Sequence, residues 1–128
     1  MQIKWEGVMP AVTTKFTKED TLDLEMFEIN IQAQLKAGVS AIILGGTLGE
    51  ASTLTDDEKK ILIQETVRIV DGNIPVIINI AEQTTKGAIE AASKAKKYGA
   101  SGLMMLPPMR YKANDFETVT YFKEVAKS

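Results

Sequence analysis

Three short apolar runs, each bounded by turn residues, stand out along the chain: residues 40–46, 75–81 and 102–106. Their apolarity is continuous rather than alternating, which is typical of strands buried on both faces in a parallel sheet. A weaker run, residues 7–13, is a candidate first strand, although Pro10 restricts it to a sheet edge or a strand end. The pattern therefore predicts four strands.

The segments between these runs have the period of helices. From residue 23 to residue 37, apolar side chains recur every three or four positions, and Gly38 follows as a stop. Thr55 and Glu58 have the spacing of a capping box, so a second helix is predicted from there until Gly72. A third, alanine-rich helix is expected over residues 85–98.

A fourth helix is predicted to begin near Asn114, with Glu117 three residues on. Each helix thus follows a strand, four times over. Such alternation predicts parallel strands joined by right-handed crossovers, and hence an α/β protein. A complete eight-unit barrel needs about 250 residues, so four units are half of one, whereas an open sheet of four or five strands is complete in itself. Pattern alone slightly favours the open sheet.

Composition fits a single globular domain over residues 1–128, because 45% of the residues are hydrophobic and 25% are charged. The net charge of −2 arises from 17 acidic and 15 basic residues spread along the chain, so neither nucleic acid nor a membrane is an expected partner. The start of the chain has no signal-peptide pattern and no run is long enough to span a membrane, so a cytoplasmic protein is expected.

The sequence contains neither cysteine nor histidine. This absence excludes disulfides, thiolate metal sites and the commonest general base. Any catalysis must therefore use Lys, Tyr, Asp, Glu, Ser or Thr.

The stretch ILGGTLGE, at residues 43–50, leaves the second predicted strand on the side where α/β proteins bind ligands. Gly45, Gly46 and Gly49 would let backbone amides approach a carboxylate or phosphate, and Thr47 adds a hydroxyl. The spacing matches neither G-x-G-x-x-G nor a P-loop, so an open-sheet nucleotide-binding domain is not supported. From composition alone, a tight strand exit without a ligand is the favoured interpretation.

Two further polar residues lie on the same loop side. Glu50 follows the glycines, but a carboxylate at a turn more often caps amides than catalyses. Tyr111 follows the fourth strand, where a phenol could pass protons or simply pack its ring.

The glycine and tyrosine motifs occur together, with their spacing, in one enzyme family. The segments GVMPAVTTKF, AGVSAIILGGTLGEASTLTDDEK, IPVIINIAEQTT and YGASGLMMLPPMRY make nearly all of the chain resemble the amino-terminal half of the dihydrodipicolinate synthase and N-acetylneuraminate lyase family. The second segment is similar to the family signature G-[TS]-T-G-E. The resemblance implies a (βα)₄ half of a TIM (βα)₈ barrel.

The resemblance also implies a cytoplasmic, homo-oligomeric class I aldolase-type lyase or synthase that binds pyruvate or a related 2-oxo acid as a Schiff base on a lysine. Such an enzyme needs no metal and no organic cofactor. Tyr111 would be the proton relay, and Thr47 would bond that phenol and position the substrate carboxylate. The amides of Leu48 and Gly49 would hold the carboxylate. Leu48 stands where the family often has a second hydroxyl, and the loop before Tyr111 differs from the tyrosine-pair loops of the best-known members.

The family's Schiff-base lysine lies on the sixth strand, beyond residue 128. Lys15 and Lys112 lie on the loop side with polar neighbours, and Lys59 and the other helix lysines are interpreted as solvent-facing. We therefore expect this chain alone to be inactive. It would be a fragment of a longer protein, an incomplete sequence, or a half-barrel that pairs with itself or with a complementary half. A non-catalytic self-associating half-barrel or small-anion-binding domain is the alternative.

Overall fold

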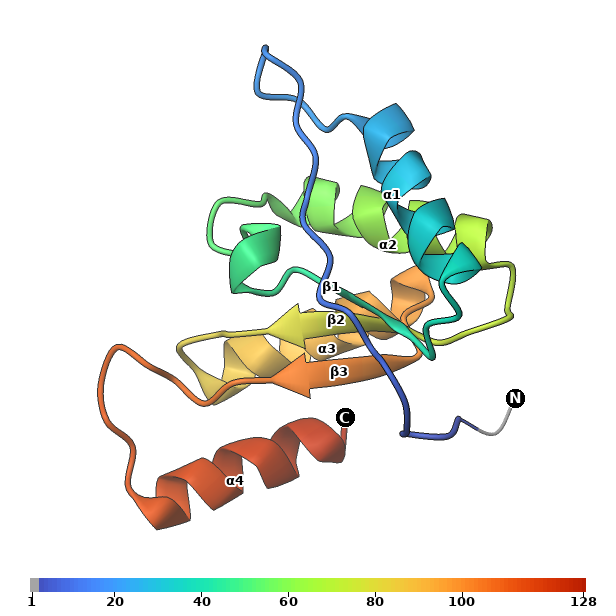
Figure 1. Cartoon of the computed structure of the whole chain (residues 1–128). Coiled ribbons are helices and arrows are strands. Elements are labelled where there is room, and N and C mark those ends of the chain that lie inside the picture. Colours follow the sequence, from blue (N-terminus) through green and yellow to red (C-terminus); the bar gives the residue numbers. More distant parts are fainter. Residues whose placement is uncertain (1–2) are drawn as a thin grey trace.

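The computed structural model describes residues 3–128 and contains one parallel sheet. Its strands follow the order of the sequence: β1 (Ile42–Leu44), β2 (Val76–Ile80) and β3 (Gly102–Met105). Leu44 lies opposite Ile78, and Ile80 lies opposite Met105. Figure 1 shows the arrowheads of β2 and β3 at the same end of the sheet. The loops that follow the strands therefore gather at that end.

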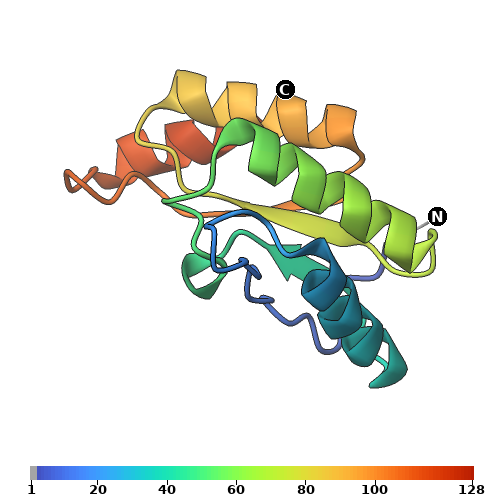
Figure 2. The same cartoon turned by 90° about the horizontal axis from the view of Figure 1, so that it is seen from above.

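Helices cover one face of this sheet. Within residues 3–128 they are α1 (Leu24–Lys36), α2 (Asp56–Val70), α3 (Thr85–Tyr98) and α4 (Asp115–Ala126), with a short 3₁₀ helix, η1 (Thr47–Gly49), after β1. Figures 1 and 2 show α3 on the side of the sheet opposite the amino-terminal segment. The predicted α/β alternation is confirmed. No helix in the described part of the chain has the length and apolarity needed to cross a membrane.

The helix starts follow from local sequence. The Thr55 side chain accepts a hydrogen bond from the Glu58 amide while the Glu58 carboxylate accepts from the Thr55 amide. Asn114 and Glu117 form the same reciprocal pair at the start of α4. These bonds satisfy amides that have no partner inside the helix, which fixes where each helix begins.

The predicted first strand is largely absent. Residues 7–13 run beside β1, but only Ala11 forms a parallel bridge, with Ile43. The Val12 amide donates to the Ile43 carbonyl at 3.0 Å, and the Ile43 amide donates to the Pro10 carbonyl at 2.9 Å. Because Pro10 has no amide hydrogen, the ladder cannot continue through it. The described residues therefore form three strands rather than four, and the predicted first strand is reduced to the isolated Ala11–Ile43 bridge.

The core lies between the sheet and the helices in two clusters. The larger cluster joins β1 and β2 to α1 and α2 and includes Phe27, Leu44 and Leu62, each at most 2% exposed. The smaller one joins Ile80 to α3 and α4, where Tyr121 is 3% exposed. Burial of this apolar surface is the main force that holds the helices on the sheet.

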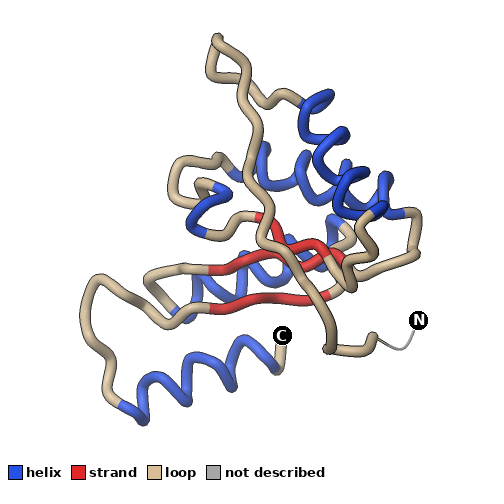
Figure 3. The backbone as a smooth tube through the Cα atoms, viewed as in Figure 1, coloured by secondary structure: helices blue, strands red, loops and turns tan. Residues whose placement is uncertain are grey.

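The other face of the sheet is crossed by the amino-terminal segment, as Figures 1 and 3 show. Trp5 packs there against Gly102 of β3: a Cβ built on Gly102 would lie 2.5 Å from Cη2 of the indole. Trp5 is still 59% exposed, and Ala11 is exposed as well. This face is therefore covered only in part by the described residues.

We expect Gly102→Ala to displace the indole, because a methyl group and Cη2 cannot share a 2.5 Å separation. Trp5 is the single tryptophan of the chain, so its fluorescence emission should shift toward longer wavelength. The free energy of unfolding should fall by less than about 1 kcal/mol, because the end of an exposed side chain can move. Ser93→Ala on exposed α3 surface is the control. An unchanged emission spectrum would contradict the contact.

Candidate functional site

The glycine turn, residues 45–50, links β1 to α2 at the carboxyl edge of the sheet. Gly45 adopts a left-handed conformation with φ 61°. Within the turn, the Gly49 amide donates to the Gly46 carbonyl at 2.9 Å. The amides of Thr47 and Leu48, at the start of η1, have no hydrogen-bond partner in residues 3–128. The turn therefore offers two adjacent free amides beside the Thr47 hydroxyl.

Gly49 ties this turn to the amino-terminal segment. The Thr14 hydroxyl donates to the Gly49 carbonyl at 2.6 Å. A Cβ built on Gly49 would lie 3.0 Å from the Val12 carbonyl oxygen, so only glycine fits without a backbone shift. Gly49 is buried, whereas Thr47 is exposed and Leu48 is 75% exposed. The glycine thus holds the turn in place while the residues before it face outward.

The strand-end cleft is a cavity of about 430 Å³ beside this turn. It is lined by the end of β2 and by segments that follow all three strands: Gly45, Thr47, Ala51, Ser52, Leu54, Lys59, Ile78, Asn79, Ala81, Glu82, Leu106 and Met109. Of the four residues predicted for the site, Thr47 lines the cleft. Leu48 and Gly49 belong to the adjoining turn but do not line the cavity.

Tyr111 lies on the loop after β3 and is 79% exposed. It does not line the strand-end cleft, although Met109 of the same loop does. The Arg110 amide donates to the Gln83 side chain at 3.3 Å, which links this loop to the segment after β2. The structure thus brings the tyrosine loop to the cleft without bringing the phenol to Thr47. Glu50 adopts a left-handed conformation with φ 60° in the turn itself.

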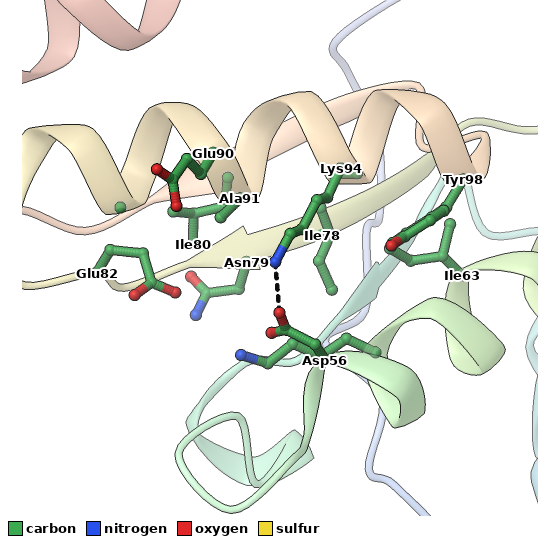
Figure 4. A pocket seen from close by; sticks show the side chains of 13 residues that line it. Asp56, Ile63, Ile78, Asn79, Ile80, Glu82, Glu90, Ala91, Lys94 and Tyr98 are labelled. Carbon is green, nitrogen blue, oxygen red and sulfur yellow. Dashed lines mark hydrogen bonds and ion pairs between the residues drawn. The ribbon is translucent and has the colours of Figure 1, made fainter.

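Four polar residues of the cleft wall were not predicted, namely Ser52 and the group of Lys59, Asn79 and Glu82. Lys59, Asn79 and Glu82 also line a second space of about 210 Å³ between α2 and α3, the interhelix cavity. Figure 4 shows this cavity, with the amide of Asn79 between Glu82 and Asp56 in that view. Lys59 was predicted to face solvent but is partly buried. The sequence feature that could have indicated this part of the cleft wall is Asn79, a polar residue inside the apolar run VIINI.

An ion pair spans the interhelix cavity. The Lys94 ammonium donates to the Asp56 carboxylate at 2.5 Å, joining α3 to the first turn of α2 (Figure 4). This hydrogen bond and the attraction between the charges lower the pKa of Asp56 from its ordinary value. They also raise the pKa of Lys94. Both side chains are at least half exposed, so the pair adds little to stability.

The pair should contribute stability only while both groups are charged. Because the pKa of Asp56 is lower in the folded state, its contribution is present above the unfolded pKa near 3.9 and is lost as pH falls through the folded pKa. The contribution of Lys94, whose pKa is raised, is lost as pH rises through that pKa. We therefore expect Asp56→Asn to lower Tm by about 1–2 °C at pH 7 and by less at pH 2.

Asp57→Asn is the matched control, because Asp57 lies in the same helical turn and forms no ion pair within the described residues. Asp57 interacts with the helix dipole as Asp56 does, but it has no ion pair with a lysine. Equal Tm changes for the two variants at pH 7 would assign the effect to the dipole instead.

The described residues contain no group of three or more carboxylate side chains arranged to hold a metal ion. The cavity wall offers hydrogen bonding and charge through the Thr47 hydroxyl, the Asn79 amide and the opposite charges of Lys59 and Glu82. The free amides of Thr47 and Leu48 lie in the turn beside it. Amide and hydroxyl donors at this end of a sheet suit a small anionic ligand.

The family model described as the dihydrodipicolinate synthetase family matches residues 4–128 of the chain. The 4-hydroxy-tetrahydrodipicolinate synthase of Thermotoga neapolitana is 37% identical over 123 residues, which are 96% of this chain and 42% of that protein. The enzyme of the same name from Methanoculleus marisnigri is 33% identical, covering 95% of this chain and 43% of the relative.

Solved structures show the same likeness. A chloride-inhibited dihydrodipicolinate synthase from Acinetobacter baumannii, complexed with pyruvate, has a TM-score of 0.92 at 28% identity over 97% of this chain and 43% of that one. An E. coli prophage protein of the dihydrodipicolinic acid synthase family, also with pyruvate, has a TM-score of 0.89 at 30% identity, covering 96% and 41%. The chain therefore spans about two fifths of the length of the relatives it matches.

Proposed function

Because the chain belongs to the dihydrodipicolinate synthetase family, we propose that it carries the carboxylate-binding part of a site for pyruvate or a related 2-oxo acid. The observation that carries this proposal is the glycine turn beside the strand-end cleft, with its two free amides and the Thr47 hydroxyl. A 2-oxo acid bears a fixed negative charge, which these donors would satisfy. The parent reaction would be that of a Schiff-base-forming lyase or synthase.

Within this proposal, the Thr47 hydroxyl and the Leu48 amide hold the carboxylate. The Gly49 amide is already bonded to Gly46, so Gly49 contributes by holding the turn rather than by a free donor. Tyr111 would act as the proton relay once its loop brings the phenol over the cleft. Its high exposure and the presence of Met109 at the cleft support such a movement, because few contacts hold the phenol where it is.

The imine-forming lysine would be supplied by the part of the relatives' length that this chain does not match. We propose that this chain forms one half-barrel, with the bridged amino-terminal segment in the place of a first strand, and that it binds the 2-oxo acid without forming an imine. A Schiff-base lysine must be partly neutral near pH 7, which requires apolar or cationic surroundings. Lys59 is the lysine of the cleft lining, and the carboxylate of Glu82 lies in the same wall, so the surroundings of this lysine are neither purely apolar nor purely cationic.

The proposal can be tested by titrating the isotope-labelled chain with pyruvate and following the NMR chemical shifts of its backbone amides. The backbone amide signals of Thr47 and Leu48 should shift, and Thr47→Val should weaken binding by about 10-fold or more through the loss of one hydrogen bond to a charged group. Thr13→Val, an exposed threonine outside the cleft lining, should bind as the unaltered chain does. Treatment with borohydride should leave no pyruvate adduct in the mass spectrum. The absence of any shift at the turn would refute the proposal.

A non-catalytic self-associating half-barrel is the second candidate. Apolar side chains are exposed on the two outermost helices: Met26 and Ile29 on α1, and Phe116 and Val119 on α4, each between 49% and 79% exposed. Exposed apolar groups on both flanks favour association. Sedimentation of the titrated sample distinguishes the two candidates, because a scaffold should form dimers or larger species. In a scaffold, pyruvate should also leave the amide signals of Thr47 and Leu48 unchanged.

A further inference from the structure

Asn79 is the one polar residue of β2, whose other members are a valine and three isoleucines. It follows Ile78, which lies opposite Leu44, so Asn79 lies level with Gly45 at the start of the glycine turn. Asparagine is disfavoured in strands, and no local turn requires it here. The residue type at this position therefore needs an explanation other than secondary structure.

The side-chain oxygen of Asn79 is buried and has no hydrogen-bond partner within residues 3–128. A buried acceptor without a donor destabilises a fold, whereas an apolar side chain of the same shape carries no such cost. The strand thus contains a polar group that folding alone does not favour. Residues that break a local rule in this way are typical of binding sites.

The position of Asn79 agrees with a binding role. It lines the strand-end cleft and the interhelix cavity, and Glu82 and Lys59 line both as well. In Figure 4 its amide lies between Glu82 and the Asp56–Lys94 pair. The amide can turn by half a rotation about its last torsion, which exchanges the positions of oxygen and nitrogen. It can therefore present either an acceptor or a donor to a ligand.

We propose that Asn79 is a specificity-determining residue, and that its amide binds a hydroxyl group on the carbon chain of the 2-oxo acid held by the glycine turn. This inference rests on the proposed function. A hydroxyl both donates and accepts, so it pairs with the amide in either orientation. The Glu82 carboxylate in the same wall can also accept a hydrogen bond from a hydroxyl. The ligand class is thus a hydroxylated 2-oxo acid.

Pyruvate and 3-hydroxypyruvate are suitable probes because they differ by one hydroxyl. In titrations of the labelled chain, hydroxypyruvate should bind about 5-fold more tightly than pyruvate. Asn79→Leu should abolish this preference and raise Tm, since it removes the unpartnered oxygen. Asn79→Ala should also abolish the preference if leucine perturbs the fold. Asn30→Leu on α1 is the control for the effect of replacing an asparagine by leucine outside the cleft.

Three results overturn the inference. Equal affinities of the unaltered chain for the two probes would remove the hydroxyl contact while leaving the proposed function intact. A preference that survives in both Asn79 variants would assign the contact to another residue. The absence of shifts at Thr47 and Leu48 with either probe would refute the proposed function, and the inference would fail with it.

Discussion

Phe27→Ala should lower the free energy of unfolding by about 3–5 kcal/mol, because it removes a ring that is 1% exposed from the larger core cluster. The ring contributes to fixing α1 against β1 and α2. A domain of this length is expected to have a stability of about 6–19 kcal/mol, so the loss is a large share of the total. Denaturant unfolding followed by far-UV circular dichroism measures the change.

Met26→Ala is the matched control for this experiment. Met26 precedes Phe27 on the same helix but is 49% exposed, so its truncation should cost less than about 1 kcal/mol. Similar losses for the two variants would mean that α1 is not held by its buried face.

The adjacent glycines Gly45 and Gly46 should respond to alanine with opposite signs. At Gly45, φ is 61° and a Cβ would lie 3.2 Å from Ile78 Cδ1, so Gly45→Ala should cost about 2 kcal/mol. At Gly46, φ is −70° and the nearest atom to a new Cβ is 3.6 Å away. Gly46→Ala should therefore stabilise the chain by about 0.4–1 kcal/mol by restricting the unfolded state.

Thermal unfolding of the two variants, compared with the unaltered chain, checks this difference. Each variant controls for the other, because the same methyl group is added at neighbouring positions of one turn. A stabilising Gly45→Ala would show that the turn does not require the left-handed conformation. Pyruvate titration of Gly46→Ala would then report whether a stabilised turn keeps its free amides.

The helices were predictable because their signals are local. The capping pairs Thr55–Glu58 and Asn114–Glu117 lie three residues apart, and each helix start was found where the pair predicted it. The first strand failed for an equally local reason. Pro10 was recognised as a restriction, yet its missing amide hydrogen interrupts the ladder more completely than a strand end would.

The candidate site was predictable only in part. The glycine turn is one continuous stretch of sequence, so its residues could be named before the fold was known. The cleft wall combines Lys59, Asn79 and Glu82 from α2, from β2 and from the loop after it, and no spacing rule links these positions. Lys59 was misplaced because helical periodicity gives a face but does not show what covers that face. The exposure of Tyr111 depends on a loop conformation that the sequence does not encode locally.

The order of the strands in the sheet is the order in which they are synthesised. Neighbouring elements in space are also neighbours in the chain: β1 with β2, β2 with β3, α1 with α2, α2 with α3 and α3 with α4. Each new βα unit can therefore pack on the one before it as it leaves the ribosome, without waiting for a distant partner. A chain assembled in this way has one growing edge, β3, and an insertion or duplication of a whole unit there would disturb only the last interface.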